Sequence, residues 1–416
     1  MKHTALIIIL ISYGLSNHIN AQVQKNPKRF YIENSTRKSI QMPFKLLNNL
    51  IVLPVFVNQS DTLNFILDSG ISNTIIVDES LADRLGLQFK REIQMYGFGG
   101  GGALSAQHSV ENDIRIGGIV GLHQDILVVP NPDIDFSKLL GIKVHGLLGY
   151  NIFRDLIIEV NYDAKIISFH TPRTYTYKNR KKNTTLPLTL IDTKPFITSQ
   201  IIQDDSSKVE GRFLIDSGAS FALWIDLFSD SAFTLPQKSE SLYLGTGLGG
   251  AVYGKVGRIK EFGTGNMQLH NVIASYNDTA IVGPIPFSDK RNGIVGADIL
   301  SRFNVIFDYR NGKITFRPNS KVRDAFQVNL SGMEICCPTP GQSLFSISNI
   351  YQNSPAHKAG LKAGDEIMYI NSQELSKLSL PEVHALLLKK PSKKLFVQYK
   401  RDGVVCSTTL LMTDCI

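Results

Sequence analysis

Short apolar runs that end in turn residues recur along most of the chain, and they predict β-strands rather than helices. Residues 65–67 and 213–215 are two such runs, and each leads directly into an Asp-Ser-Gly triplet. Two strand-like hairpins follow, at residues 156–169 and 305–316, and the second contains Asn-Gly at positions 311–312, a two-residue turn signal. The pattern predicts a mainly β fold.

The same order of segments occurs twice, which indicates a duplicated domain. The triplets at residues 68–70 and 216–218 lie 148 residues apart, and the glycine-rich stretches 96–102 and 244–250 keep that offset. A segment with glycine, two apolar residues and glycine then recurs at a separation of 147 residues. A period this long is typical of two related lobes and not of a short-repeat solenoid.

The two aspartates of the triplets, Asp68 and Asp216, are the candidate catalytic residues. Neighbouring carboxylates cannot both ionise at low cost, so such a pair holds one proton over a broad pH range. The ionised carboxylate can take a proton from water while the protonated one hydrogen-bonds a scissile carbonyl oxygen. A lone Asp-Ser-Gly is typical of a turn, but the matched second copy favours catalysis.

The residues beside each aspartate are predicted to support the pair. Glycine lets the backbone bend tightly and approach the partner loop, and the serine hydroxyls are expected to hydrogen-bond across the two loops rather than attack substrate. The predicted supporting residues are Ser69, Gly70, Ser217 and Gly218.

The glycine-rich stretches are predicted to be flaps, hairpin tips that close over a substrate. They also fit G-x-G-x-x-G, but residues 251–259 read as strand where a dinucleotide site needs a helix. For the two aromatic residues of the first stretch, pocket lining and ordinary packing both stay open. The candidate substrate-binding residues are Tyr96, Gly97, Phe98, Gly99, Gly245, Thr246 and Gly247.

This order of parts resembles the aspartic peptidases of the retroviral type over about residues 46 to 318. In that family an Asp-Thr/Ser-Gly loop is followed by a glycine-rich flap, two apolar residues and a glycine. The resemblance implies hydrolysis of a protein or peptide substrate in a monomer, with no metal or organic cofactor. Serine stands for the commoner threonine at Ser69 and Ser217, which keeps the hydroxyl and loses a methyl group.

The chain changes character after about residue 330 and resembles a PDZ domain of the bacterial periplasmic type along residues 354–371. Ser354 is expected to cap a short helix, and Ser379 with Glu382 forms a capping box for a second helix. The resemblance implies a C-terminal peptide ligand, although a purely structural role stays open. The predicted peptide-binding residues are Leu330, Ser331, Gly332 and Met333.

The N-terminus and the composition bear on where the protein works. Residues 1–21 read as a secretory signal, because Lys2 and His3 precede a short apolar run and Ala21 ends a cleavage site before Gln22, with Ile19 a fair match at the minus-three position. We therefore expect export, periplasmic or extracellular, with no transmembrane segment after signal removal. The net charge of +8 is modest for 416 residues and does not indicate nucleic-acid binding.

Other site types find no support in the sequence. No H-E-x-x-H, Cys-x-x-Cys or G-x-S-x-G pattern is present, which argues against a zinc enzyme and a serine hydrolase. All four cysteines fall in the PDZ-like region, and three pairings stay open.

Together these patterns predict an exported, single-chain aspartic endopeptidase with two pseudo-twofold-related β lobes and a C-terminal PDZ domain. The alternative is a non-catalytic protein, or a peptidase dedicated to itself or to one partner, that uses the fold and the PDZ domain as a scaffold. The predicted boundaries are signal peptide 1–21, polar lead or pro-segment 22–45, first lobe 46–175, linker 176–185, second lobe 186–318 and PDZ domain 325–416.

Overall fold

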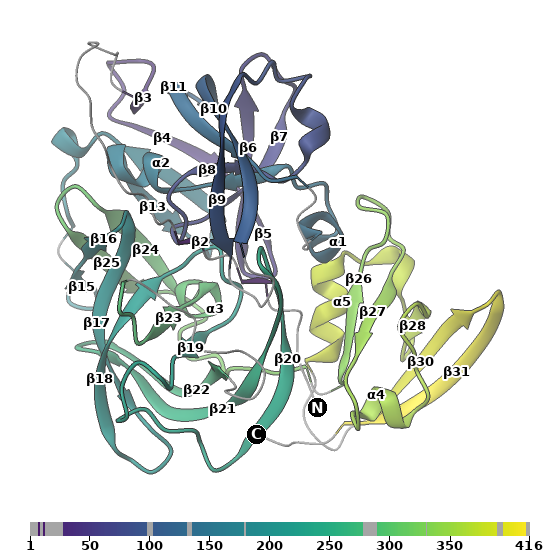
Figure 1. Ribbon diagram of the computed structural model, residues 1–416. Coiled ribbons are helices and arrows are strands. Elements are labelled where there is room, and N and C mark those ends of the chain that lie inside the picture. The colour runs from purple at the N-terminus through teal and green to yellow at the C-terminus, as the bar shows by residue number, and fades with distance from the viewer. Residues whose placement is uncertain are drawn as a thin grey trace.

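The computed structural model of the chain shows two β lobes that face each other and a smaller module beside them (Figure 1). This arrangement confirms the predicted mainly β fold with two sheet-rich lobes and a C-terminal PDZ region. The structure describes residues 7–8, 11–12, 28–97, 103–130, 135–178, 180–277, 289–329, 331–388 and 394–412.

The first lobe is built on one large sheet. Its strands are β2 (Ile11–Ser12), β3 (Phe30–Ile32), β5 (Lys45–Leu47), β6 (Leu50–Val57), β7 (Leu63–Leu67), β8 (Thr74–Ile76), β9 (Phe89–Gly97), β10 (Ala103–Ile116), β11 (Ile119–Val128) and β12 (Gly146–Leu148). The order along the sheet is β2-β9-β10-β11-β8-β12-β7-β6-β5, and β3 pairs with β11. The helical segments are η1 (Glu79–Leu81), α1 (Phe136–Leu140) and α2 (Tyr150–Asp155).

The second lobe repeats this architecture. Its strands are β1 (Ile7–Ile8), β16 (Thr189–Ile191), β17 (Lys194–Ile202), β18 (Lys208–Ile215), β19 (Leu223–Ile225), β20 (Ser239–Gly247), β21 (Gly250–Thr264), β22 (Met267–Asn277) and β23 (Gly293–Val295), with the helix α3 (Ala297–Leu300). The order β1-β20-β21-β22-β19-β23-β18-β17-β16 matches the first lobe strand for strand. The internal duplication predicted from the triplets is therefore confirmed.

A third sheet joins the two lobes. Its strands, in spatial order, are β15 (Thr184–Pro187), β25 (Lys313–Pro318), β24 (Phe303–Asp308), β13 (Ile157–Asn161), β14 (Ile166–His170) and β4 (Ser39–Pro43). The pairing of β13 with β24 crosses the pseudo-twofold axis, with Glu159 opposite Ile306. A short helix, η2 (Pro172–Thr174), follows β14.

The stretch 22–45, predicted to be a polar lead or pro-segment, contributes β3 to the sheet of the first lobe and β4 to the joining sheet. One local expectation differs from the structure. The Asn311-Gly312 turn closes a four-residue loop instead of a two-residue one, since Asp308 pairs with Lys313. The Asp308 carboxylate accepts hydrogen bonds from Asn311 N (3.0 Å) and Nδ2 (2.7 Å), which holds the longer loop.

The PDZ region has its own sheet and two helices. Its elements are β26 (Met333–Cys336), β27 (Ser346–Ile350), α4 (Pro355–Lys358), β28 (Glu366–Ile370), β29 (Gln373–Glu374), η3 (Leu375–Lys377), α5 (Leu380–Leu387), β30 (Lys394–Arg401) and β31 (Val404–Leu411). The order β26-β27-β28-β30-β31 leaves β26 at an edge. Both predicted caps are present, at Ser354 and in the box of Ser379 with Glu382.

The buried apolar residues show how the parts are held together. The two lobes share one cluster, which runs through the joining sheet and includes Phe153 and Phe307. The PDZ region packs on a separate cluster. A smaller cluster gathers Met95, Phe136 and Leu248, so it joins the first flap, α1 and the tip of the second flap.

Most of the predicted signal peptide lies outside the described residues. The exceptions are β2, which runs antiparallel to β9, and β1, which runs parallel to β20. In the part of the chain that the structure describes, no helix has the length and apolar character needed to cross a membrane.

Candidate active site

The fold brings the two predicted aspartates to equivalent places, one in each lobe. Asp68 directly follows β7 and Asp216 directly follows β18, and both side chains are fully buried. The Asp68 N–H donates to the Leu148 carbonyl and the Asp216 N–H donates to that of Val295, both at 2.9 Å. The repeated apolar pair before glycine is thus the strand that anchors each aspartate.

The two serines tie the loops to each other, as the sequence predicted. Ser69 Oγ donates to the Ile215 carbonyl, and Ser217 Oγ donates to the Leu67 carbonyl, both at 2.8 Å. Each hydroxyl also accepts a hydrogen bond from the other serine's N–H at 3.0 Å. These four reciprocal hydrogen bonds fix the two aspartates relative to one another. Each serine hydroxyl both donates and accepts within them, so it holds the loops together.

The glycines of the triplets are needed because the loops approach so closely. A Cβ atom on Gly70 would lie 2.7 Å from Asp216 Cγ, which is well inside van der Waals contact. Gly70 N donates to Asp68 Oδ1 at 2.7 Å, and Gly218 N donates to Asp216 Oδ1 at 2.8 Å. Each carboxylate is therefore oriented by its own loop and faces the glycine of the other loop.

The remaining carboxylate oxygens are the ones available for chemistry. Oδ2 of Asp68 and Oδ2 of Asp216 are buried and meet no hydrogen-bond donor at bonding distance within the described residues. A buried, unpaired carboxylate oxygen is costly unless it carries or accepts a proton. Two such atoms on facing loops fit a pair that shares one proton.

Burial governs the titration of this pair. Burial raises the pKa of Asp68 well above its ordinary value, and the charge of Asp216 raises it further. Burial also raises the pKa of Asp216, while hydrogen bonds from its own loop and the charge of Arg291 oppose that rise. Both directions fit a pair that holds one proton between its two carboxyl groups over a broad pH range.

Two buried polar residues near the pair were missed by the sequence reasoning. Lys194 is 3% exposed, and burial, followed by the charge of Arg291, lowers its pKa to about 8. Lys194 begins β17 where Leu50 begins the equivalent β6, so a comparison of the two repeats could have revealed it. Burial raises the pKa of Tyr309, and the charges of both aspartates raise it further.

The two predicted flaps contact each other. The first is the β9–β10 hairpin and the second is the β20–β21 hairpin. A Cβ atom on Gly249 would lie 2.6 Å from the Gly97 carbonyl oxygen, so Gly249 at the turn of the second hairpin touches the end of β9 through backbone atoms. Leu248 is completely buried in the cluster that contains Met95. The apolar contacts between the flaps thus come from residues that the sequence analysis did not select.

The predicted substrate-binding residues of the flaps are only partly described. Tyr96 is 53% exposed and lies on the opposite face of β9 from Met95, so its ring does not line a buried pocket. Phe98 and Gly99 lie outside the described residues. Gly245 and Thr246 lie in β20, which ends at Gly247, and Gly245 has a φ of 136° that favours glycine.

The flap edges accept extended backbone. Ile7 lies opposite Thr246 on the second flap, and Ile11 lies opposite Gly97 on the first. One short apolar segment therefore pairs with both flaps through its main chain, which is how an extended peptide is expected to bind.

The predicted PDZ residues are separate from the aspartate pair. Ser331, Gly332 and Met333 lead into β26, and Leu330 lies outside the described residues. Within the described ranges no group of three or more His, Cys, Asp and Glu side chains is placed to hold a metal ion. Cys336, Cys337 and Cys406 are free thiols.

Comparisons with known proteins agree with this site. A family model for aspartyl proteases matches residues 53–152 and again 202–299, and a PDZ domain model matches residues 346–401. A search of curated proteins returned no match. A similar solved structure is the aspartic proteinase from Irpex lacteus, with 14% identity, 69% of this chain and 99% of that chain covered, and a TM-score of 0.42. The twofold family match shows that the chain belongs to the retropepsin-like aspartyl proteases, duplicated here in one chain and followed by a PDZ domain.

Proposed function

We propose that the protein is an exported aspartic endopeptidase that works as a monomer, with Asp68 and Asp216 as its catalytic pair. The observation that carries the proposal is the reciprocal bracing of two buried aspartates by Ser69 and Ser217. A protein that had lost catalysis would gain nothing from keeping two unpaired carboxylate oxygens buried face to face.

The two aspartates would divide the acid and base roles of peptide hydrolysis between them. The ionised member of the pair takes a proton from a water molecule that attacks the scissile carbonyl carbon. The protonated member hydrogen-bonds the carbonyl oxygen and then supplies a proton toward the leaving amine. The site thereby returns to one shared proton after each cycle. The chain's own carboxylates supply the acid and the base, so the scheme needs no cofactor.

A substrate would lie extended between the aspartate pair and the flaps. The pairing of Ile7 with β20 and of Ile11 with β9 supports this mode, because both pairs use main-chain groups that any peptide possesses.

The PDZ domain would recruit protein substrates or partners by their C-termini. The edge position of β26, next to the loop of Ser331 and Gly332, supports this proposal, because PDZ domains bind a peptide as an added strand at a sheet edge. The chemistry stays with the lobes, since both aspartates lie there.

Isosteric substitution of each aspartate tests the catalytic proposal. Asp68→Asn and Asp216→Asn should each lower cleavage of a diverse peptide library at least about 1000-fold, because an amide cannot exchange the proton. Mass spectrometry at several pH values reads the cleavages. Asp226→Asn is the matched control, since Asp226 is also buried in the second lobe and its carboxylate hydrogen-bonds its own loop and Asn277 instead of an aspartate of the other lobe.

The outcomes separate the alternatives. Turnover near that of the wild type in either aspartate variant would refute the pair. A wild-type protein that cleaves nothing in the library but processes its own N-terminus or one partner would instead be a dedicated peptidase. Export is tested by the mass of the secreted protein, which should begin at Gln22.

A further inference from the structure

The peptide-accepting edge of the PDZ domain carries backbone groups that can be traced one by one. Gly332 O accepts from Tyr351 N at 2.9 Å, so residue 332 faces β27. Successive residues of a strand alternate, and after the irregularity in the β26–β27 register the outward-facing residues are Met333, Ile335 and Cys337. A peptide that adds to β26 must pair with these outward groups.

The chain itself already occupies the end of this edge next to the predicted carboxylate-binding loop. Asn329, 2% exposed, donates from Nδ2 to the Met333 carbonyl at 2.8 Å and accepts the Ser331 N–H at 3.0 Å through Oδ1. The Met333 N–H donates to Ser331 Oγ at 3.2 Å. The Asn329 side chain thus takes both roles of the last residue of a bound peptide. Its Nδ2 replaces the peptide N–H that would donate to β26, and its Oδ1 replaces the carboxylate that would accept from the loop.

The middle and the far end of the edge are occupied too. His384 of α5 donates from Nε2 to the Ile335 carbonyl at 2.9 Å. The Cys337 N–H donates to the Lys138 carbonyl of α1 at 2.9 Å, and the Gly341 N–H donates to the Gly141 carbonyl at the same distance. Figure 1 shows α1 of the first lobe lying against β26 and α5. We call residues 138–141 the docking segment.

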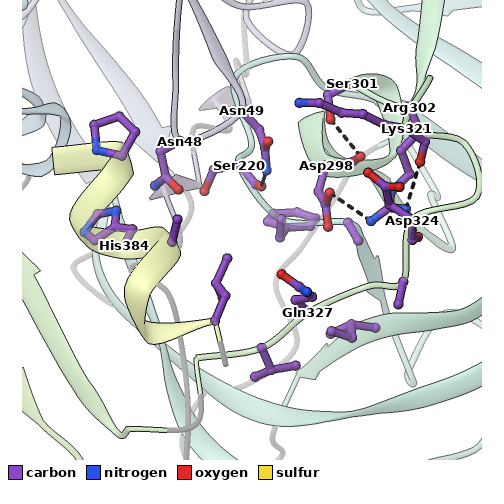
Figure 2. Close-up of a pocket in the computed structure, with 18 of the residues that line it drawn as sticks. Asn48, Asn49, Ser220, Asp298, Ser301, Arg302, Lys321, Asp324, Gln327 and His384 are labelled. Atoms are coloured by element: carbon purple, nitrogen blue, oxygen red, sulfur yellow. Dashed lines mark hydrogen bonds and ion pairs between the residues drawn. The ribbon is translucent and has the colours of Figure 1, made fainter. Parts of the chain in front are cut away.

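The PDZ domain contacts both lobes, with a pocket of about 670 Å³ beside α5. Figure 2 shows His384 on α5 at one side of this pocket, with Asp298 and Arg302 of the second lobe on the other side. This face of α5 is therefore separated from Asp298 and Arg302 by the pocket, while Ile273 of the second lobe packs against the PDZ cluster. The docking segment holds the PDZ edge by two backbone hydrogen bonds and by the packing of Gly141 against Leu380.

We propose that the first lobe is a ligand in cis of the PDZ domain: the docking segment, together with Asn329 and His384, fills the peptide-accepting edge of β26. A protein C-terminus then binds there only when the docking segment leaves the edge and the Asn329 and His384 side chains turn away from it. The inference rests on the PDZ part of the proposed function and is independent of the aspartate pair.

Gly141 offers a way to open the contact without touching the groove. A Cβ atom at this position would lie 3.2 Å from Leu380 Cβ, and its φ of 72° is one that asparagine tolerates. Gly141→Asn should therefore wedge the docking segment from α5 while keeping the turn after α1. Gly86→Asn is the matched control, because Gly86 has a φ of 62° in the same lobe and open space around its Cβ.

The same position allows the contact to be locked. A Cβ atom on Gly141 would lie 3.8 Å from Cys337 Cβ, the usual separation in a disulfide. Gly141→Cys, with serine at the other three cysteines, should form a disulfide with Cys337 under mild oxidation. Replacement of Cys337 by serine should abolish the crosslink.

Binding is measured with a pool of fluorescein-labelled decapeptides that carry free apolar C-termini, and with the same pool amidated. We expect Gly141→Asn to bind the free-carboxylate pool at least tenfold more tightly than the wild type, and Gly86→Asn to match the wild type. The oxidised Gly141→Cys protein should not bind, and reduction should restore binding. Amide exchange at Cys337 should be at least tenfold faster in Gly141→Asn alone.

Each other result counts against the proposal. Failure of a folded Gly141→Cys protein to crosslink, or wild-type exchange at Cys337 in Gly141→Asn, would show that the first lobe does not occupy this edge. Equal affinity of the locked and open proteins would show that the docking segment does not block peptides. No binding by any form, with the crosslink present, would refute C-terminal capture while leaving the aspartate pair untouched.

Discussion

At the scale of residues, the site depends on groups that are satisfied only by the opposite loop. Ser217 is 1% exposed, and its hydroxyl accepts a hydrogen bond from the Ser69 N–H at 3.0 Å. The same hydroxyl donates to the Leu67 carbonyl. A single oxygen therefore hydrogen-bonds two buried backbone groups, the Ser69 N–H and the Leu67 carbonyl. Both serines are needed to keep the two loops joined.

Removal of this hydroxyl should destabilise the fold. Ser217→Ala leaves one buried N–H and one buried carbonyl without a partner, so we expect the free energy of unfolding to fall by about 2 to 4 kcal/mol. Urea denaturation measures the change. Ser217→Thr keeps the oxygen and serves as the matched control. A loss as large in Ser217→Thr as in Ser217→Ala would mean that space, not hydrogen bonding, limits this position.

The buried Lys194 should set the alkaline limit of activity. Its positive charge lowers the pKa of Asp68, which burial has raised. Lys194→Met removes that charge, so the pKa of Asp68 rises and the pair keeps its proton to higher pH. The alkaline limb of the bell-shaped kcat/KM profile should move toward higher pH. The exposed Lys208→Met in the same lobe should leave the profile unchanged, and a shift toward lower pH in Lys194→Met would contradict the assignment.

Much of the site could be predicted from the sequence because each half of it is local. A triplet, a glycine-rich tip and an apolar pair before glycine are short segments, and their repetition placed Asp68 and Asp216 together. Lys194, Met95 and Leu248 were missed because their roles depend on which residues lie across the sheet or across the axis. Such non-local contacts leave no periodic signal in one chain.

At the scale of elements, the two predicted flaps pack against each other and do not stand as independent hairpins. Leu248 of the second flap is buried with Met95 of the first, and Gly249 touches Gly97 through backbone atoms. The α1 helix lies in the same cluster through Phe136. Opening for a substrate must therefore separate both tips at once.

A single methyl group at the tip should disturb this closure. Gly249→Ala places a Cβ 2.6 Å from the Gly97 carbonyl oxygen, so the tips cannot meet as they do here. We expect kcat/KM to fall about tenfold or more, and the unfolding free energy to fall by about 1 to 3 kcal/mol because the buried tip contact is overpacked. Gly118→Ala, whose Cβ would meet only the end of the Ile40 side chain at 3.1 Å, is the control. Unchanged kinetics in Gly249→Ala would show that tip contact is dispensable.

At the scale of the whole molecule, the segment between the second lobe and the PDZ domain belongs partly to the peptidase core. Phe326 is 4% exposed within the cluster shared by both lobes, and the Arg302 guanidinium lies 3.5 Å from the centroid of its ring. Asn329 a few residues later already serves the PDZ loop. The predicted start of the PDZ domain at residue 325 thus falls before a residue that the lobes need, which local composition could not reveal.

Two truncations that differ by five residues should therefore behave differently. A protein that ends at residue 324 lacks Phe326 and should lose about 3 to 5 kcal/mol of stability, as should Phe326→Ala in the full chain. A protein that ends at residue 329 keeps Phe326, so it should melt as one unit and cleave short peptides at the wild-type rate. Its processing of a protein substrate that docks through its C-terminus should fall, because the chemistry remains while the docking domain is gone. Thermal melting and paired assays on a short peptide and a protein substrate measure these outcomes. A stable protein ending at 329 that does not cleave short peptides would show that the PDZ domain is part of the catalytic unit. In that case the contact of β26 with the docking segment would be required to hold α1 and the apolar cluster of the flaps in place.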